Sequence, residues 1–327
     1  MTVDWSKLDH AYGPATDTPE HLSALEFGDA AERLAALGHL DTAVLHQGFP
    51  ATATAPALRA VTTLLAEGRA HPDTVEALLE FLGHAAYSLV NLAGNSYFAA
   101  ELPGIADAIT QAYPVVLPLL ETSPPQRAMF RAYHLTTMAQ TPRLADEREM
   151  LAVLVLEWAE RDTGPQADWI QCLARLGVDL RYRIDDPDPA VRLSAALGHE
   201  DDPRCQELIL TALAEPPPPG VQKYDVVAAA IRIAADFDAI ADAACRLAER
   251  DRNWPGADLG WGALVKFAFP QPYGKRRPLS SAQRALLRAL VANDNLWNPK
   301  DGNCAVVFKS AGLPHSRGAC RRLSDPE

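Results

Sequence analysis

The side chains that carry metal and acid–base chemistry gather most densely at His199-Glu200-Asp201-Asp202. Imidazole nitrogens and carboxylate oxygens are common metal ligands, so this run is the densest potential metal cluster in the sequence. It follows Gly198 at an expected helix end, where an acidic side chain can accept hydrogen bonds from the first N–H groups of the next helix. We therefore interpret the run as a helix cap and predict no metal site.

His134 and the cysteines are the next candidates for chemistry. His134 could act as a general base if a carboxylate oriented it, but a lone helical histidine is usually a packed or surface residue. Cys172, Cys205 and Cys245 fall within expected helices, where they read as core thiols, because a reactive thiolate needs an exposed, electropositive setting. The odd total of five cysteines, with no C-x-x-C pair, is typical of a reducing compartment and predicts a cytoplasmic location.

Known catalytic and phosphate-binding motifs do not occur in the sequence. It contains no H-E-x-x-H, G-x-x-x-x-G-K-[ST], G-x-S-x-G or G-x-G-x-x-G pattern. We predict no catalytic residues and no cofactor, and the sequence favours a protein that is not an enzyme.

Two groups of residues remain as binding candidates. His46 and Gln47 can bind a ligand or hydrogen-bond the turn before Gly48, and the turn is the favoured interpretation. Trp254 and Trp261 precede the basic cluster Lys275-Arg276-Arg277, which can meet phosphates. Trp261 also reads as a core residue and the basic cluster as a solvated loop. The formal net charge of −12 makes nucleic-acid binding unlikely.

Charge is distributed unevenly along the chain. The first 259 residues carry a formal charge of −19, and the segment from Lys266 to the end carries +7. We expect a protein partner with a basic patch that meets the acidic body. No apolar run is long enough to cross a bilayer, and the N-terminus does not read as a signal peptide, so we expect no membrane association.

The elements that must position these residues are helices almost throughout. Apolar residues recur with the helical period, as at Val75, Leu78, Leu79 and Leu82. Ser280 and Gln283 form a capping-box pattern. The run Met150 to Leu156 is apolar all round and predicts a fully buried helix, with a buried strand as the less favoured alternative. The alternating Leu180 to Ile184 is the best strand candidate. The sequence predicts an all-α fold.

One segment indicates a helical repeat. In the run from Asp185 to Gly198, acidic residues precede Pro189, Val191 and Arg192, and small residues follow. Asp188 can cap a helix, Pro189 fits its first turn, and Arg192 can reach the acidic turn of its own or a neighbouring unit. Gly28 to Gly38 is a weaker copy of this pattern.

This pattern resembles bacterial HEAT repeats of the phycobilisome-lyase-like kind. The segments Tyr12 to Ala15, Thr18-Pro19 and His46 to Gly48, together with Trp297 and Gly312 to Pro314 near the end, are similar to an uncharacterised group of bacterial HEAT-repeat proteins. The resemblance implies one α-solenoid domain over residues 1–327, which we expect to bend near the polyproline stretch at 216–220.

The resemblance also implies a function in protein–protein interaction. HEAT folds bind proteins through extended concave surfaces, which fits an adaptor, a regulator or an immunity-type binder. The alternative is an enzyme on a HEAT scaffold with a small-molecule or nucleic-acid substrate. A deep pocket with converging His, Asp, Glu or Arg side chains would favour that alternative.

Overall fold

The fold is all-α, as the sequence predicts. The computed structural model describes residues 3–162, 164–252, 256–274, 278–298, 300 and 302–325. Strands in these ranges are confined to two small hairpins, β1 (Asp9–His10) with β2 (Gly13–Pro14) and β3 (Leu45–His46) with β4 (Phe49–Pro50). Within the same ranges, no helix combines the length and apolar character that crossing a bilayer requires.

Backbone contacts divide the chain into two compact units, Met1–Val178 and Asp179–Glu327. The proline-rich stretch at 216–220 is an exposed loop between two packed helices inside the second unit, away from this division. The expectation of one domain with a bend at this loop stays a prediction.

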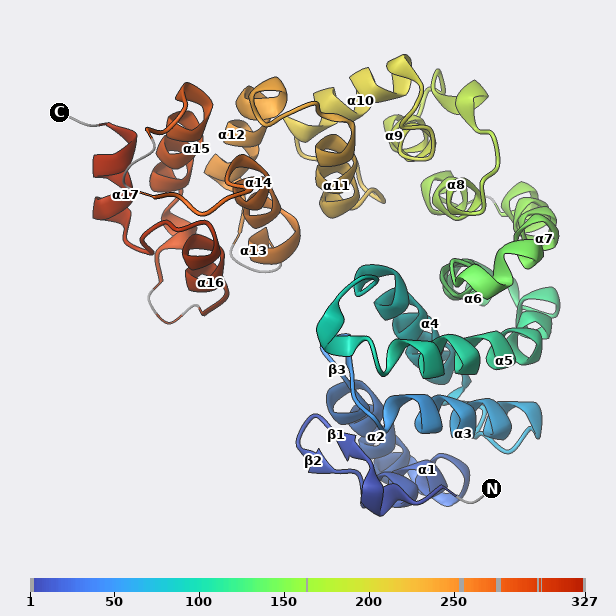
Figure 1. Cartoon of the computed structure of the whole chain (residues 1–327). Helices are drawn as coiled ribbons and strands as arrows, with labels where there is room; N and C mark the ends of the chain where they lie inside the picture. Colours follow the sequence, from blue (N-terminus) through green and yellow to red (C-terminus); the bar gives the residue numbers. More distant parts are fainter. Residues whose placement is uncertain are drawn as a thin grey trace. The chain divides into compact units, whose positions relative to one another are not determined.

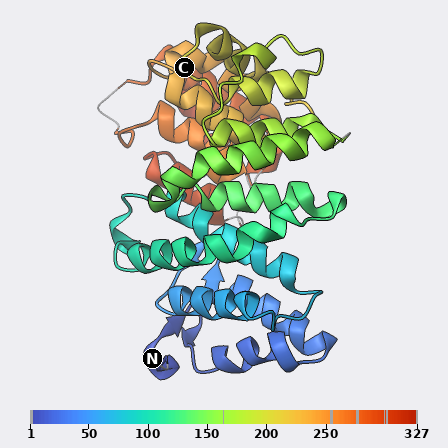
Figure 2. The ribbon, with the colours of Figure 1, turned by 90° about the vertical axis from the view of Figure 1, so that its right-hand side faces the viewer.

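The first unit is a succession of helices with short connections. Figures 1 and 2 show α1, α3 and α5 lying one above the next, and these helices pack in that order. The main helices are α1 (Thr18–Phe27), α2 (Ala30–His39), α3 (Thr54–Ala66), α4 (Val75–Asn91), α5 (Leu102–Glu121), α6 (Pro125–Met138), α7 (Arg148–Arg161) and α8 (Gln166–Arg175). Shorter turns are η1 (Trp5–Lys7), the π-helical η2 (Leu40–Val44), η3 (Ser96–Phe98) and η4 (Pro142–Glu147).

The second unit continues with shorter helices. Its first three main helices, α9, α10 and α11, pack in sequence order. The α-helices are α9 (Pro189–Ala196), α10 (Pro203–Leu213), α11 (Lys223–Ile233), α12 (Ala241–Arg250), α13 (Gly256–Leu259), α14 (Trp261–Ala268), α15 (Ser281–Ala292), α16 (Gly302–Ser310) and α17 (Arg317–Ser324). The 3-10 turns are η5 (Arg181–Arg183), η6 (Asp238–Ile240) and η7 (Asp294–Leu296).

Each unit has its own apolar core. Leu58, Ile109 and Trp169 are fully buried in the first unit, and Trp261 and Phe308 are fully buried in the second. Burial of large apolar side chains is the main favourable contribution to folding. Each unit therefore contains the kind of core that can hold its own helices together.

One local prediction is wrong, and another is confirmed only in its helical part. The run Met150 to Leu156 forms helix α7, but only Leu151 and Val155 of this run are fully buried, because α6 and α8 pack on one side of the helix. The alternating run Leu180 to Ile184 is no strand, because its middle forms the 3-10 turn η5. Periodicity over so few residues does not distinguish a strand from a tight turn.

Candidate functional site

The predicted repeat residues Asp188, Pro189 and Arg192 cap the N-terminus of α9 and bind the loop before it. Asp188 is the N-cap, and its side chain accepts a hydrogen bond from the N–H of Ala190 at 2.8 Å. Pro189 occupies the first turn, where its missing N–H has no cost. The Arg192 guanidinium donates to the carbonyl oxygens of Asp186 at 2.7 Å and Pro187 at 3.1 Å. Arg192 therefore closes the turn of its own unit.

The same closure recurs at two other helices. Asp29 caps α2 in a capping box, and Arg33, four residues later, donates to the Gly28 carbonyl at 2.8 Å. Asp202 caps α10, and Gln206, again four residues later, donates to the Glu200 carbonyl at 2.7 Å. Each helix thus combines an aspartate N-cap with a side chain that ties the preceding loop to the first turn.

Helix α7 presents an apolar face to solvent. Met150, Val153 and Leu156 are 57%, 57% and 41% exposed. The helical period places the exposed acids Glu149, Glu157 and Glu160 on this same face. We call these six residues the α7 face. Exposed apolar groups flanked by charge are typical of interaction surfaces.

His46 ends strand β3, and Gln47 begins the β3–β4 turn. Gln47 has φ +53°, and Gly48 has φ +78°, so both adopt the left-handed conformation that a tight hairpin turn requires. Nδ1 of His46 lies 2.7 Å from the Thr42 carbonyl oxygen and 3.3 Å from the Tyr12 hydroxyl. The contact with Tyr12 connects two of the N-terminal segments that carried the family resemblance. A ligand-binding role for His46 and Gln47 stays a prediction.

The structure brings together a cluster of side chains that no sequence motif indicates. His10, Asp17 and His39 each offer a ligand atom, and these atoms all lie within 4.8 Å of one another. We call these three residues the N-terminal histidine cluster. Burial, with a further contribution from His21, lowers the pKa of His39 to about 4, so its ring is neutral at pH 7. The available signal was compositional, since four of the nine histidines fall within the first 46 residues.

The His199–Asp202 run is a helix connection, as predicted. Asp202 caps α10, and Nε2 of His199 accepts a hydrogen bond from the Leu180 N–H at 2.8 Å. Glu200 pairs with Arg232. Glu200 and Asp202 are therefore occupied by structural contacts.

None of the five cysteines, all within the described ranges, forms a disulfide, and four of the five are buried. Burial raises the pKa of Cys172 to about 12 and that of Cys245 to about 11. Thiols with such raised pKa values carry little thiolate at neutral pH and are poor nucleophiles. The prediction that Cys172 and Cys205 are core thiols is confirmed, whereas Cys245 is only partly buried.

The remaining binding candidates lie in the core or outside the described residues. The structure places the Trp261 ring fully in the core, 5.7 Å from the Phe308 ring between centroids, where it cannot contact a partner. Its backbone N–H donates to the buried carboxylate of Asp251 at 3.0 Å. Trp254 and the cluster Lys275, Arg276 and Arg277 lie outside the described residues.

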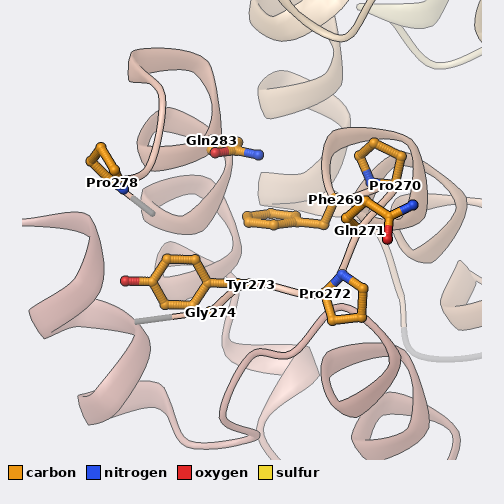
Figure 3. A pocket seen from close by; sticks show the side chains of 8 residues that line it. All are labelled: Phe269, Pro270, Gln271, Pro272, Tyr273, Gly274, Pro278 and Gln283. Carbon is orange, nitrogen blue, oxygen red and sulfur yellow. The ribbon is translucent and has the colours of Figure 1, made fainter. Parts of the chain in front are cut away.

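An open pocket of about 420 Å³ adjoins α14 and α15 (Figure 3). Phe269 and Tyr273 present their rings to it, and Gln283 supplies an amide. Its described lining is Phe269, Pro270, Gln271, Pro272, Tyr273, Gly274, Pro278 and Gln283. No His, Asp, Glu or Arg belongs to that described lining.

A second cavity, of about 380 Å³, lies between α2 and α4. Asp41, Glu80 and His84 contribute to its lining. Nε2 of His84 is 3.7 Å from the Glu80 carboxylate, and about half of each side chain is exposed to solvent. Water screens such a pair strongly, so this geometry does not orient the imidazole for general-base catalysis.

Comparisons with models of known protein families, with curated proteins and with solved structures find no match to this chain.

Proposed function

We propose that this chain is an α-solenoid of HEAT-like repeats that binds a protein partner. The recurring helix N-terminus supports the repeat architecture, because an aspartate cap with a loop-closing side chain four residues later occurs at α2, α9 and α10. Packing of successive helices such as α9, α10 and α11 also agrees with a stack, in which each repeat contacts its neighbours.

The α7 face is the observation that carries the binding proposal. Its three exposed apolar side chains lie opposite the buried face that holds Leu151 and Val155. An apolar centre with acidic flanks complements an amphipathic helix whose apolar face is bordered by Lys or Arg. The partner is accordingly a protein with such a basic amphipathic segment.

Affinity capture with matched variants tests this proposal. The immobilised full chain is compared with the double variant Met150→Ser/Val153→Ser and with the control Leu34→Ser. Leu34 is also exposed, on α2, so the control removes apolar surface elsewhere in the same unit. We expect a partner that the wild type and the control retain and that the α7 variant loses.

Ionic strength provides the second arm of this test. Because acidic groups flank the apolar centre, retention of the partner should fall as salt rises above the physiological range. A partner that the α7 variant retains as well as wild type would refute the role of this face. A partner whose affinity does not respond to salt would refute the electrostatic part.

A further inference from the structure

The N-terminal histidine cluster joins three separate elements. His10 lies on β1, Asp17 immediately precedes α1, and His39 is the last residue of α2. Nε2 of His10 is 3.1 Å from Oδ1 of Asp17, and Nδ1 of His39 is 3.9 Å from Oδ2 of the same carboxylate. The two imidazoles are 7% and 8% exposed, while Asp17 is 51% exposed. Two buried nitrogens thus face a carboxylate that borders solvent.

Neighbouring side chains orient the His39 ring. Nε2 of His39 lies 3.0 Å from the hydroxyl of Thr18, which is fully buried. A proton on Nε2 donated to this hydroxyl leaves the lone pair of Nδ1 directed at Asp17. His21 stacks on the His39 ring at 4.2 Å between centroids, and His10 lies edge-on at 5.3 Å. Such outer contacts are the ones that hold metal-binding imidazoles in place.

We propose that His10, Asp17 and His39 bind a divalent transition metal ion of the zinc class. Imidazole nitrogens suit zinc, cobalt and nickel, whereas magnesium and calcium prefer oxygen ligands only. A tetrahedral site with bonds of about 2.1 Å separates its ligand atoms by about 3.4 Å. The three ligand atoms lie within 4.8 Å of one another, so they must move closer by up to about 1.4 Å when the ion binds.

Metal binding requires one proton to move on His10. The backbone N–H of Tyr12 donates to Nδ1 of His10 at 3.1 Å, so the metal-free ring carries its proton on Nε2 and donates it to Asp17. When the ion binds Nε2, that proton transfers to Nδ1 through solvent and the ring stays neutral. The hydrogen bond from the Tyr12 N–H to Nδ1 is then lost, because the protonated Nδ1 no longer has a free lone pair.

The ion would fasten the N-terminal hairpin to the first helix pair. A metal that binds only the folded chain also stabilises it by mass action. This role is independent of partner binding, since none of the three ligands belongs to the α7 face.

Metal titration of the full chain tests the site. Bound metal is first removed with a chelator. Binding of Zn²⁺ is then measured by calorimetry, and binding of Co²⁺ by its visible absorption, which reports nitrogen and oxygen coordination. We expect one ion per chain and a higher melting temperature with Zn²⁺. Asp17→Asn should lower the affinity at least tenfold, and Thr18→Val should lower it about 10-fold through the freed His39 ring.

Matched variants make the outcome decisive. Asp17 is half exposed, so Asp17→Asn is expected to fold, and His10→Gln provides a second ligand variant whose fold is checked by circular dichroism. His71→Gln is the control, because His71 lies beside Asp73 in an exposed pair outside the cluster. Three outcomes would overturn the proposal. The wild-type chain binds no metal, metal binding survives both Asp17→Asn and His10→Gln, or His71→Gln abolishes it.

Discussion

The imidazole of His134 packs against the rings of Phe130 and Tyr133, 4.4 and 5.2 Å away between centroids. Burial, with a smaller contribution from His84, lowers its pKa from the usual 6.5 to about 4, although Glu76 acts in the opposite direction. The unfolded chain therefore binds a proton between these two pH values that the folded chain does not bind. The free energy of unfolding should fall as the pH drops through this range.

The loss from His134 should reach about 2 kcal/mol at pH 5. His134→Leu removes this titration. The free energy of unfolding, measured with urea and with chelator present, should therefore fall less steeply between pH 7 and pH 5 in the variant than in the wild-type chain. Part of this pH dependence of the free energy of unfolding should remain, because His39 has a similarly lowered pKa. If the free energy of unfolding of the variant depends on pH as steeply as that of the wild type, the assignment to His134 is wrong.

Gly83 is the residue on α4 that lets His134 approach. A Cβ at this position would overlap the His134 imidazole. Gly83→Ala should therefore destabilise the chain by about 1–3 kcal/mol, as expected for overpacking. Gly38→Ala is the matched control: Gly38 lies in α2 with nothing within 4 Å of its Cβ position, and alanine there should stabilise by about 0.5–1 kcal/mol. Equal melting temperatures for the two variants would refute this explanation.

At the scale of the helix, the N-cap of α9 gives a direct measure of the repeat pattern. Asp188→Ala removes the acceptor for the Ala190 N–H and should lower the free energy of unfolding by about 1 kcal/mol. Glu207→Ala, in an exposed position of α10, should change it by less than about 0.5 kcal/mol. Denaturant unfolding of both variants provides the comparison, and equal effects would mean that the cap contributes nothing of its own.

Features that depend on neighbouring residues were predictable, and those that depend on packing were not. The Ser280–Gln283 capping box is confirmed because both of its hydrogen bonds lie within one turn. The exposure of Met150 and Val153 was missed, since an apolar run does not indicate which sides of a helix are covered. The histidine cluster was missed because a hairpin and two helices must pack before its three residues meet.

At the scale of the whole molecule, the two separate cores lead to the last prediction. Each compact unit has fully buried large side chains of its own, and a unit of this length can bury enough apolar surface to fold alone. A fragment of residues 1–178 contains both the α7 face and the N-terminal histidine cluster. We expect it to unfold cooperatively on heating, to bind Co²⁺ and to retain the partner of the full chain.

The complementary fragment, residues 179–327, serves as the control for this experiment. It should also give a helical circular dichroism spectrum, because Trp261 and Phe308 form its core, but it should bind neither Co²⁺ nor the partner. Loss of cooperative unfolding in fragment 1–178 would show that its core needs the rest of the chain. Partner binding by fragment 179–327 would instead place the interaction surface outside α7, because that fragment lacks every residue of the α7 face.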